Sequence, residues 1–403
     1  MKGDSVKKTT CHLIVLWLFV MNTPTWSQQK EIIGYYPDWK WKSRNNLVTP
    51  GRIPYEKLTM INYAFFYPLP DGNLVGRDTV GDNLYLRGID DPQKPYLQAT
   101  TPLIELAHKQ GVRVMLSLGG WEESYNFPQV AASESKRAQF AHSCLEKIRI
   151  FGFDGIDIDW EYPCLTIHNG MPADKQNYTL LLQTTRDSLN AFSKQTGKHY
   201  LLTAALSGLP SGAENFEMEK VGKILDLLNV MTYDFNGSWD RLSGFNSPLY
   251  PPRADDPIRN VDAAFKLYTE TFKISAAKIN LGVPFYGQTY TRCTALYSPH
   301  GGADTIHFSP QGAFYYDIIQ VMDQFSRYWD KQAKVPYLIS SSWNTLISYD
   351  DAESVGYKAQ YVIDHHAGGL IIWEITGDFL PDGRTPLLDV IYSKFRNSGH
   401  TGK

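Results

Sequence analysis

Three acidic side chains recur at every second position near the middle of the chain. Within residues 156–161, Asp157, Asp159 and Glu161 alternate with two isoleucines and a tryptophan. Because side chains two residues apart in a strand share a face, the carboxyl groups would line one face and the apolar residues the other. An exposed acidic edge strand is the alternative interpretation, but the apolar residues between the acids favour burial. Buried like charges are costly for stability, so this spacing indicates an active site.

Carboxyl groups in this arrangement suit the hydrolysis of a glycosidic bond. Glu161 lies nearest the end of the strand and is the natural general acid, since burial beside a second acid would raise its pKa. Asp159 is too close to Glu161 to activate water across a sugar ring, and Asp157 lies deeper. Three acids could also bind a divalent cation, but no histidine accompanies them, and we expect neither a metal nor a cofactor. Asp154 has the opposite parity, and we expect it to fix the backbone at the start of the strand.

Alternating apolar runs and amphipathic stretches predict the elements that position these side chains. The runs expected to form strands are the acidic segment and residues 32–36, 60–66, 112–117, 200–206, 224–233, 278–285 and 369–373. Helices are expected at residues 103–109, 133–151, 176–195, 261–271, 352–365 and 387–395, and a loop at 80–96. Eight strands interleaved with helices predict an α/β fold, the closed (β/α)8 TIM barrel. A doubly wound open sheet ranks second, because no glycine-rich phosphate loop follows the first strand.

The alternation stops after the seventh strand. Residues 288–348 mix β-rich and aromatic segments with turns, and we interpret them as a small α+β insertion subdomain within a barrel that extends over residues 28–403. The high aromatic content, with 25 Tyr, 19 Phe and 10 Trp, suits a cleft that binds the flat faces of sugar rings. Active sites of such barrels lie at the carboxyl ends of the strands. The following polar, aromatic or glycine residues gather at those expected ends: Tyr35, Phe65, Gly119, Gly120, Trp121, Tyr233, Asp234, Tyr286 and Trp373.

The first 27 residues have the pattern of a secretory signal peptide. Basic residues precede an apolar run from Leu13 to Met21, and the small residues Thr25 and Ser27 suit cleavage after Ser27. The run is too short to cross a bilayer, although an uncleaved anchor is the alternative. We therefore expect a secreted, extracellular monomer that has no membrane contact after cleavage. A net charge near -3 gives no reason to expect nucleic acid as a partner.

Cysteine usage constrains the stability of the fold. After loss of the signal peptide, Cys144, Cys164 and Cys293 remain, which allow one disulfide at most. We expect the apolar core, and not disulfides, to hold the fold together. We also expect the catalytic domain to act alone, since no cysteine-rich or aromatic-rich binding module follows Phe395.

Several motifs together carry a resemblance to a known family. Residues 154–161 resemble the D-x-x-D-x-D-x-E signature of family 18 glycoside hydrolases, the chitinases. Residues 117–121 resemble the S-x-G-G motif of the third strand in that family, and residues 231–234 the M-x-Y-D motif of the sixth. Residues 281–287 resemble the seventh-strand motif, and Trp373 resembles the aromatic residue that closes the barrel floor. The resemblance extends over essentially the whole chain after residue 27, and many members carry an insertion after the seventh strand.

The resemblance implies substrate-assisted hydrolysis of chitin or chito-oligosaccharides with retained configuration. Glu161 would protonate the glycosidic oxygen, and the acetamido oxygen of the substrate would attack the anomeric carbon. Asp159 would orient the acetamido group and share a proton with Asp157. Tyr233 would hydrogen-bond the acetamido oxygen, and Asp234 would help to hold the distorted sugar. The implied substrate-binding residues are Trp373 beneath the sugar, the further walls Trp121, Tyr35, Phe65, Tyr162 and Tyr286, and the motif residues Gly119, Gly120 and Met231.

Two residues depart from the family pattern, and two other functions compete with a chitinase. Gln288 stands where many members have arginine, and Asn236 where several have histidine, which leaves pH optimum and subsite preference open. A chitin-binding lectin on the same barrel is the first alternative, but lectin-type relatives typically replace the acid that Glu161 represents. An endo-β-N-acetylglucosaminidase is the second, and the insertion favours the deep cleft of a chitinase over it.

Overall fold

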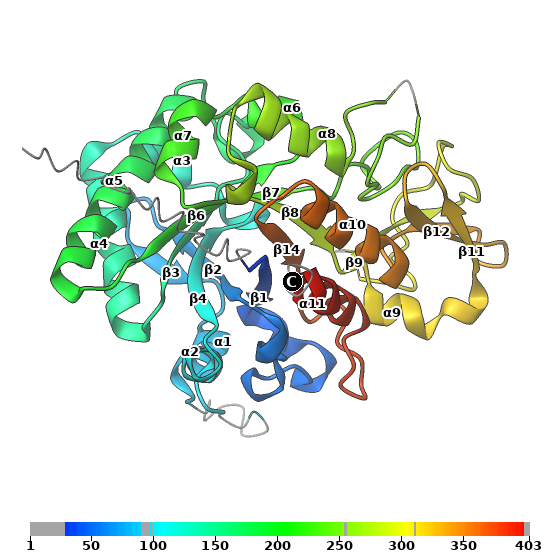
Figure 1. Ribbon diagram of the computed structural model, residues 1–403, viewed down its shortest axis with the longest axis horizontal. Coiled ribbons are helices and arrows are strands. Elements are labelled where there is room, and N and C mark those ends of the chain that lie inside the picture. The colour runs from blue at the N-terminus through cyan, green and yellow to red at the C-terminus, as the bar shows by residue number, and fades with distance from the viewer. Residues whose placement is uncertain (1–28, 90–96, 98–99, 254–255, 310–311, 399–403) are drawn as a thin grey trace, which may run out of the picture.

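Eight parallel strands form a closed sheet in the computed structural model, which describes residues 29–89, 97, 100–253, 256–309 and 312–398 (Figure 1). The strands follow the order β1, β14, β8, β7, β6, β5, β4 and β2, and pairing of β1 with β2 closes the barrel. This closure confirms the predicted TIM barrel and excludes the open doubly wound sheet. The barrel strands are β1 (Glu31–Pro37), β2 (Met60–Pro68), β4 (Arg113–Gly119), β5 (Gly155–Asp159), β6 (Leu201–Ser207), β7 (Leu227–Met231), β8 (Ile279–Pro284) and β14 (Gly369–Trp373).

The barrel strands read as apolar runs because both of their faces are covered. Every residue of β5 and of β8 is buried. One set of side chains packs against the surrounding helices in the main core. A second, smaller cluster of strand residues consists of Ile33, Tyr35, Met60, Ala64, Phe65, Met115, Ala205, Met231 and Ile371. The strand predicted at 224–233 is shorter than expected, because the chain turns directly after Met231.

The helices between the strands have recognisable ends. The Ser133 hydroxyl accepts a hydrogen bond from the first turn of α4, and Gly152 follows that helix with φ 89°. The helix predicted at 261–271 is α-helical over Val261–Lys266 and continues as a π-helical turn over Leu267–Thr271. The helices that cover the barrel are α2 (Leu103–Lys109), α3 (Phe127–Ala131), α4 (Glu134–Phe151), α5 (Asp174–Thr196), α6 (Pro210–Ala213), α7 (Met218–Ile224), α8 (Val261–Lys266), α10 (Ala352–Asp364) and α11 (Pro386–Ser398).

The prediction of a loop at residues 80–96 is wrong for residues 80–87. A short helix α1 (Thr79–Asp82) and a π-helical turn (Asn83–Arg87) occupy this segment, and the Asp78 carboxylate caps α1 by accepting from two of its N–H groups. The remaining residues 90–96 lie outside the described part of the chain. A three-residue strand β3 (Leu74–Gly76), which the sequence analysis did not predict, pairs antiparallel with the end of β2.

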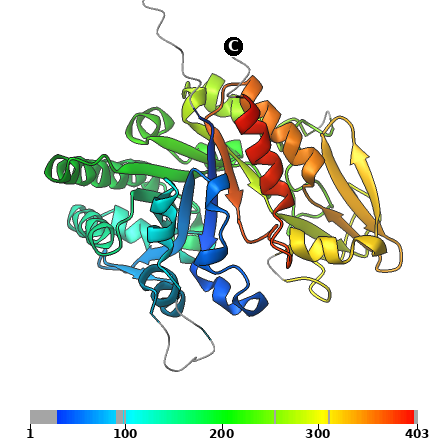
Figure 2. The ribbon, with the colours of Figure 1, turned by 60° about the horizontal axis from the view of Figure 1, so that its bottom comes forward.

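A second sheet interrupts the barrel between β8 and α10. Its five strands are antiparallel, in the order β10, β9, β13, β12 and β11. Figures 1 and 2 show this sheet, drawn in yellow and orange, on the side of the barrel opposite to α4 and α5. The predicted α+β insertion after the seventh barrel strand is therefore present. Its elements are β9 (Tyr286–Thr291), β10 (Ala313–Phe314), α9 (Tyr315–Gln320), β11 (Ser326–Asp330), β12 (Val335–Ser340) and β13 (Thr345–Ser348).

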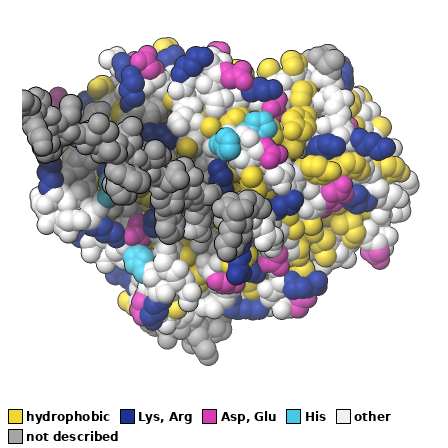
Figure 3. Space-filling model, viewed as in Figure 1, with side chains coloured by type: hydrophobic (Ala, Val, Ile, Leu, Met, Phe, Trp, Pro, Cys, Tyr) yellow, Lys and Arg dark blue, Asp and Glu magenta, His cyan; other side chains and the backbone are white. Residues whose placement is uncertain are grey.

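The surface and the cysteines add two structural facts. Hydrophobic side chains gather on the side of the molecule that carries β11 and α10 (Figure 3), where Tyr328 and Tyr357 are exposed. Cys144, Cys164 and Cys293 are all free thiols. Among the helices in the described ranges, none combines the length and apolar character that crossing a bilayer requires.

Candidate active site

Asp157 lies at the centre of a hydrogen-bond network inside the barrel. Its Oδ2 accepts from the Tyr35 hydroxyl at 2.9 Å and from the Ser117 hydroxyl at 2.8 Å. Its Oδ1 accepts from the Thr203 hydroxyl at 2.6 Å and from the Asn229 amide at 3.1 Å. These donors belong to β1, β4, β6 and β7, so four strands hold one carboxyl group. Burial raises the pKa of Asp157, and the four donors oppose that effect because they stabilise the ionised form.

Asp159 and Glu161 follow toward the carboxyl end of the barrel. Burial raises the pKa of Asp159 well above its usual value, and the negative charges of Glu161 and Asp157 raise it further. The buried Asp159 Oδ1 has no hydrogen-bond partner among the described residues. Burial also raises the pKa of Glu161 to about 7, against the lowering effect of a hydrogen bond with Tyr162. An acid with a pKa near neutrality is suited to proton donation.

The main chain of Glu161 is fixed on both sides. Its N–H donates to the Ser124 hydroxyl at 2.9 Å, and the same hydroxyl donates to the Gly120 carbonyl at 2.8 Å. Its carbonyl oxygen lies 2.6 Å from Nδ1 of His168. Because a carbonyl oxygen only accepts, Nδ1 carries the proton in this contact. Ser124 and His168 were not identified from the sequence, since each lies at the end of a three-residue 3-10 turn without a recognisable motif.

Gly119 and Gly120 are glycines because the acidic strand and an aromatic ring come too close for a side chain. Gly119 has φ 115° and Gly120 has φ 83°. A Cβ at Gly119 would lie 2.2 Å from the Asp159 carbonyl oxygen, and one at Gly120 would lie 2.6 Å from the Phe65 ring. The Gly120 N–H donates to the Asp159 carbonyl at 2.8 Å. The two glycines therefore let the end of β4 pass directly beside the acids.

Tyr233 and Asp234 form a turn just after β7. Asp234 has φ 56°, in the left-handed region, and its carboxylate points back into a group of donors. Its Oδ1 accepts from the Tyr286 hydroxyl and from the Gln288 amide, each at 2.7 Å. The rings of Tyr233 and Tyr286 meet edge to face with centroids 6.2 Å apart. Gln288, which departs from the family pattern, is thus a direct partner of Asp234, whereas Asn236 contacts the Phe245 carbonyl and Arg259.

The predicted aromatic walls occupy different depths. Trp373 stacks on Phe65 with centroids 5.7 Å apart and an interplanar angle of 15°. Tyr35 lies beside Trp373 but is only 1% exposed, so its hydroxyl holds Asp157 from below the aromatic layer. Tyr162 packs against both apolar clusters of the barrel. Trp121 is 51% exposed, and its ring meets the His168 ring edge to face at 4.7 Å.

Asp154 and Met231 are the remaining predicted residues. Asp154 accepts from the Val114 N–H at 2.7 Å and pairs with His108 and Lys198, so it fixes the backbone where β4 and β5 begin. Met231 is buried in the inner apolar cluster. In the described part of the chain, no three His, Cys, Asp or Glu side chains come together in a way that could hold a metal ion.

A barrel with clustered acids and stacked aromatic rings at the carboxyl ends of its strands is typical of enzymes that cleave sugar polymers. The family model described as glycosyl hydrolases family 18 matches residues 31–378. The chain therefore belongs to glycosyl hydrolases family 18. The resemblance inferred from the motifs is confirmed, and family membership makes the chain a glycoside hydrolase.

Relatives of known name and structure agree with this assignment. The chain is 36% identical over 397 residues to Chitinase A1 of Niallia circulans, an alignment of 86% of this chain and 56% of that protein. It is 30% identical over 348 residues to Chitinase 1 of Aphanocladium album, with 84% and 80% of the two chains aligned. The chain thus spans little more than half the length of Chitinase A1.

Among solved structures, chitinase ChiA74 from Bacillus thuringiensis superposes with a TM-score of 0.80 at 32% identity and covers 93% of this chain and 71% of its own. A family 18 N-acetylglucosaminidase from Paenibacillus barengoltzii superposes with a TM-score of 0.74 at 30% identity and covers 91% and 99%. The shared barrel therefore extends over nearly the whole of this chain, among enzymes that differ in their stated activity.

Proposed function

We propose that this protein is a secreted chitinase that hydrolyses β-1,4 bonds between N-acetylglucosamine units with retention of configuration. The observation that carries the proposal is that Asp157, Asp159 and Glu161 have different surroundings. Asp157 is held by four donors, Asp159 keeps a buried oxygen to which no described residue donates, and burial raises the pKa of Glu161 to about 7. Similarity to Chitinase A1 and Chitinase 1 supports chitin as the substrate.

Glu161 is the general acid in this proposal. It donates its proton to the glycosidic oxygen while the bond to the leaving sugar breaks. The acetamido oxygen of the same sugar forms a bond to the anomeric carbon and produces an oxazolinium ion. Water then attacks that carbon, loses a proton to Glu161 and restores the acetamido group. Two inversions at one carbon give retention, and the acid returns to its starting state.

The contacts of the other two acids support the acetamido group as the nucleophile. Each carboxylate oxygen of Asp157 already accepts two hydrogen bonds, so this carboxylate is unsuited to attack the anomeric carbon. Asp159 orients the acetamido group and balances the positive charge of the oxazolinium ion, with its proton shared with Asp157. Tyr233 hydrogen-bonds the acetamido oxygen, and Asp234 holds the distorted sugar. Family 18 is a known exception to the rule of two catalytic carboxylates.

The aromatic side chains supply the substrate-binding surface. Trp373, stacked on Phe65, lies beneath the sugar at the cleavage point. Trp121 is exposed and offers a ring to a further sugar, and the insertion sheet deepens the cleft on the side of Tyr286. An N-acetylglucosaminidase action on chain ends is the second candidate, favoured by the likeness to the Paenibacillus barengoltzii enzyme. The lectin alternative is disfavoured because Glu161 is present, and the endo-β-N-acetylglucosaminidase alternative because the insertion is present.

Secretion follows in this proposal from the basic and apolar pattern of the first 27 residues, which lie outside the described part of the chain. We also propose that the protein acts as a monomer.

The deciding experiment is product analysis on chito-oligosaccharides, with Glu161→Gln assayed in parallel. The wild type should release short oligomers whose new reducing ends have the β configuration at early times. Glu161→Gln should lose roughly a hundredfold to ten-thousandfold in kcat while still binding the oligomers, because it keeps the shape of the side chain and removes its proton. Inverted products would overturn the acetamido mechanism. A wild type that binds chitin without cleaving it would make the protein a lectin.

A further inference from the structure

The turn that carries Tyr233 and Asp234 is held by a neighbouring segment of two residues. The side-chain oxygen of Asn246 accepts from the Asp234 N–H at 2.8 Å. The Ser247 hydroxyl donates to the Thr232 carbonyl at 2.6 Å. These two contacts fix the main chain on either side of Tyr233, in a turn whose left-handed residue costs conformational energy. The position of both polar side chains of the turn therefore depends on residues 246–247.

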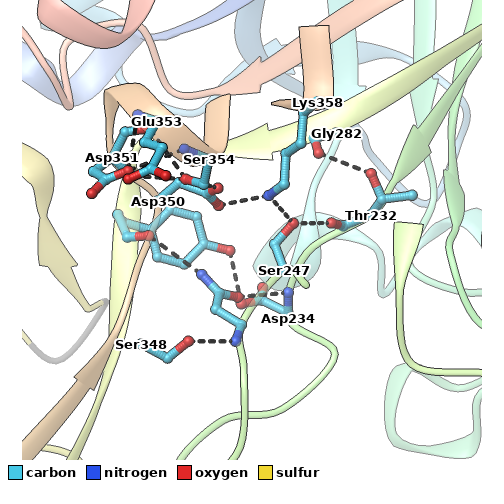
Figure 4. Close-up of polar contacts among 12 residues, drawn as sticks. Thr232, Asp234, Ser247, Gly282, Ser348, Asp350, Asp351, Glu353, Ser354 and Lys358 are labelled. Carbon is cyan, nitrogen blue, oxygen red and sulfur yellow. Dashed lines mark hydrogen bonds and ion pairs between the residues drawn. The ribbon is translucent and has the colours of Figure 1, made fainter. Parts of the chain in front are cut away.

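A buried ion pair lies behind Ser247 (Figure 4). Nζ of Lys358, on α10, is 2.6 Å from the Ser247 Oγ and 2.7 Å from the Asp350 Oδ2. Lys358 is 1% exposed and Asp350 is fully buried. An ammonium group only donates, so Lys358 must use an N–H toward Ser247. The Ser247 hydroxyl therefore accepts from Lys358 and donates its own proton to the Thr232 carbonyl.

The far side of the ion pair is anchored to the start of α10. The Ser354 hydroxyl donates to the Asp350 Oδ1 at 2.7 Å, and Asp351 caps the helix by accepting from the Glu353 and Ser354 N–H groups. The pair thus joins the start of α10 to the turn formed by residues 232–234. Buried ion pairs stabilise proteins little more than apolar residues of similar volume, because removing both charges from water is costly. Its placement between helix and turn therefore points to positioning as its role.

We propose that Lys358 and Asp350 are positioning residues for the reaction, which act through Ser247 on the turn 232–234. They hold the Thr232 carbonyl and so fix the direction in which the Tyr233 and Asp234 side chains enter the site. The inference rests on the proposed function, because that function gives the turn its role. Catalytic groups displaced by about 1 Å lose on the order of a hundredfold in rate, so a small movement of this turn would be measurable.

Two buried serines offer a matched pair of variants. The Ser247 hydroxyl accepts from Lys358 and donates to the Thr232 carbonyl, whereas the Ser143 hydroxyl, on α4, accepts from the Leu74 N–H outside this network. Ser247→Ala should lower kcat about tenfold, with KM for a chito-oligosaccharide within about twofold of the wild-type value. Ser143→Ala should leave kcat unchanged, although both variants lower Tm. Loss of kcat to the same extent in both variants, or in neither, would overturn the inference.

A paired substitution separates positioning from stability. Lys358→Met leaves Asp350 buried without its cation, so Tm should fall sharply. Addition of Asp350→Asn removes the stranded charge and should recover most of the lost Tm, whereas kcat should stay about tenfold below wild type. Recovery of kcat together with Tm would overturn the inference, because the pair would then act through stability alone. A wild type that cleaves no chito-oligosaccharide would overturn the proposed function. An active wild type whose variants keep full activity would overturn only the inference about Lys358 and Asp350.

Discussion

The Tyr35 hydroxyl lies 2.9 Å from Asp157 Oδ2 and joins the first barrel strand to the strand that carries the acids. Tyr35→Phe removes one of four donors and keeps the ring that packs beside Trp373. We expect kcat to fall about threefold to tenfold and the free energy of unfolding to fall by roughly 1.5–3 kcal/mol, as for other hydrogen bonds to charged groups. Kinetics on a chito-oligosaccharide and urea unfolding measure the two effects.

The neighbouring residue supplies the control. Tyr36 is also fully buried, and its hydroxyl donates to the Val48 carbonyl at 2.6 Å, away from the acids. Tyr36→Phe should therefore lower stability without a change in kcat. Equal kcat values for Tyr35→Phe and the wild type would contradict a role for Tyr35 in holding Asp157.

His168 and Glu161 provide a second prediction. His168 holds the Glu161 carbonyl through Nδ1 and packs its ring against Trp121 and Tyr125. The amide nitrogen of asparagine can take the place of Nδ1, whereas that of glutamine takes the place of Nε2. We expect His168→Asn to keep at least a third of the wild-type kcat and His168→Gln to lose about tenfold. Steady-state kinetics of the two variants test this, and the reverse order of activities would disprove the assigned contact.

The contact of Gln288 with Asp234 predicts a shift in pH dependence. Burial raises the pKa of Glu161 to about 7, and the negative charge of Asp234 contributes to the increase. Activity should therefore decline above about pH 7, as Glu161 loses the proton that it must donate. Gln288→Arg places a positive charge beside Asp234, favours ionised Glu161, and should move that decline to lower pH. The profile of kcat/KM against pH measures it, and Gln288→Met, which adds no charge, should leave the decline in place. A decline that moves to higher pH in Gln288→Arg would refute the argument.

Stability should fall as pH rises from 5 to 8. Burial raises the pKa values of Asp82 and Asp378 to about 7, above the value near 4 in an unfolded chain. The folded state therefore holds protons that the unfolded state has released, and the stability they contribute is complete below about pH 4 and is lost as pH passes 7. Tm measured across this range should show the fall. Asp82→Asn, which keeps an acceptor for the Tyr63 hydroxyl, should flatten it.

An exposed carboxylate serves as the control for this titration. Asp71 accepts hydrogen bonds from Asn73, which lower its pKa, so it is ionised throughout the range from pH 5 to 8. Asp71→Asn should leave the slope of Tm against pH unchanged. A Tm that stays level or rises between pH 5 and 8 in the wild type would contradict the assigned titrations.

Local patterns in the sequence were sufficient to predict the barrel strands and the position of the acidic strand. The alternation of acidic and apolar residues is visible within residues 156–161 alone. The apolar runs of the strands can likewise be recognised without knowing which strands pair with one another. Thr203 and Asn229 lie 46 and 72 residues from Asp157, so only the alignment of strands around the closed barrel brings them to it. Lys358 has the same limitation, because its spacing within α10 is that of any amphipathic helix and its partner Ser247 is 111 residues away.

Short elements escaped prediction for another reason. β3 has three residues and α1 has four, too few to show a period of either kind. Both are held by contacts made from elsewhere, β3 by pairing with β2 and α1 by its Asp78 cap. Sequence reasoning therefore located the acidic strand and missed most of the groups that hold its side chains in place.

The first residues of β9 limit how this protein could be rebuilt. Tyr286 and Gln288 are two residues apart on one strand, and both hold Asp234, while the same residues pair with β10 and β13 of the insertion sheet. A deletion of one residue just before Tyr286 would reverse the face on which each following side chain lies. Gly287 would then face Asp234, and Tyr286 and Gln288 would face away from it. An exchange of the insertion with that of another enzyme should therefore join the chains after Gln288. Homologues can be expected to vary in the length of this subdomain beyond that point while keeping the spacing before it.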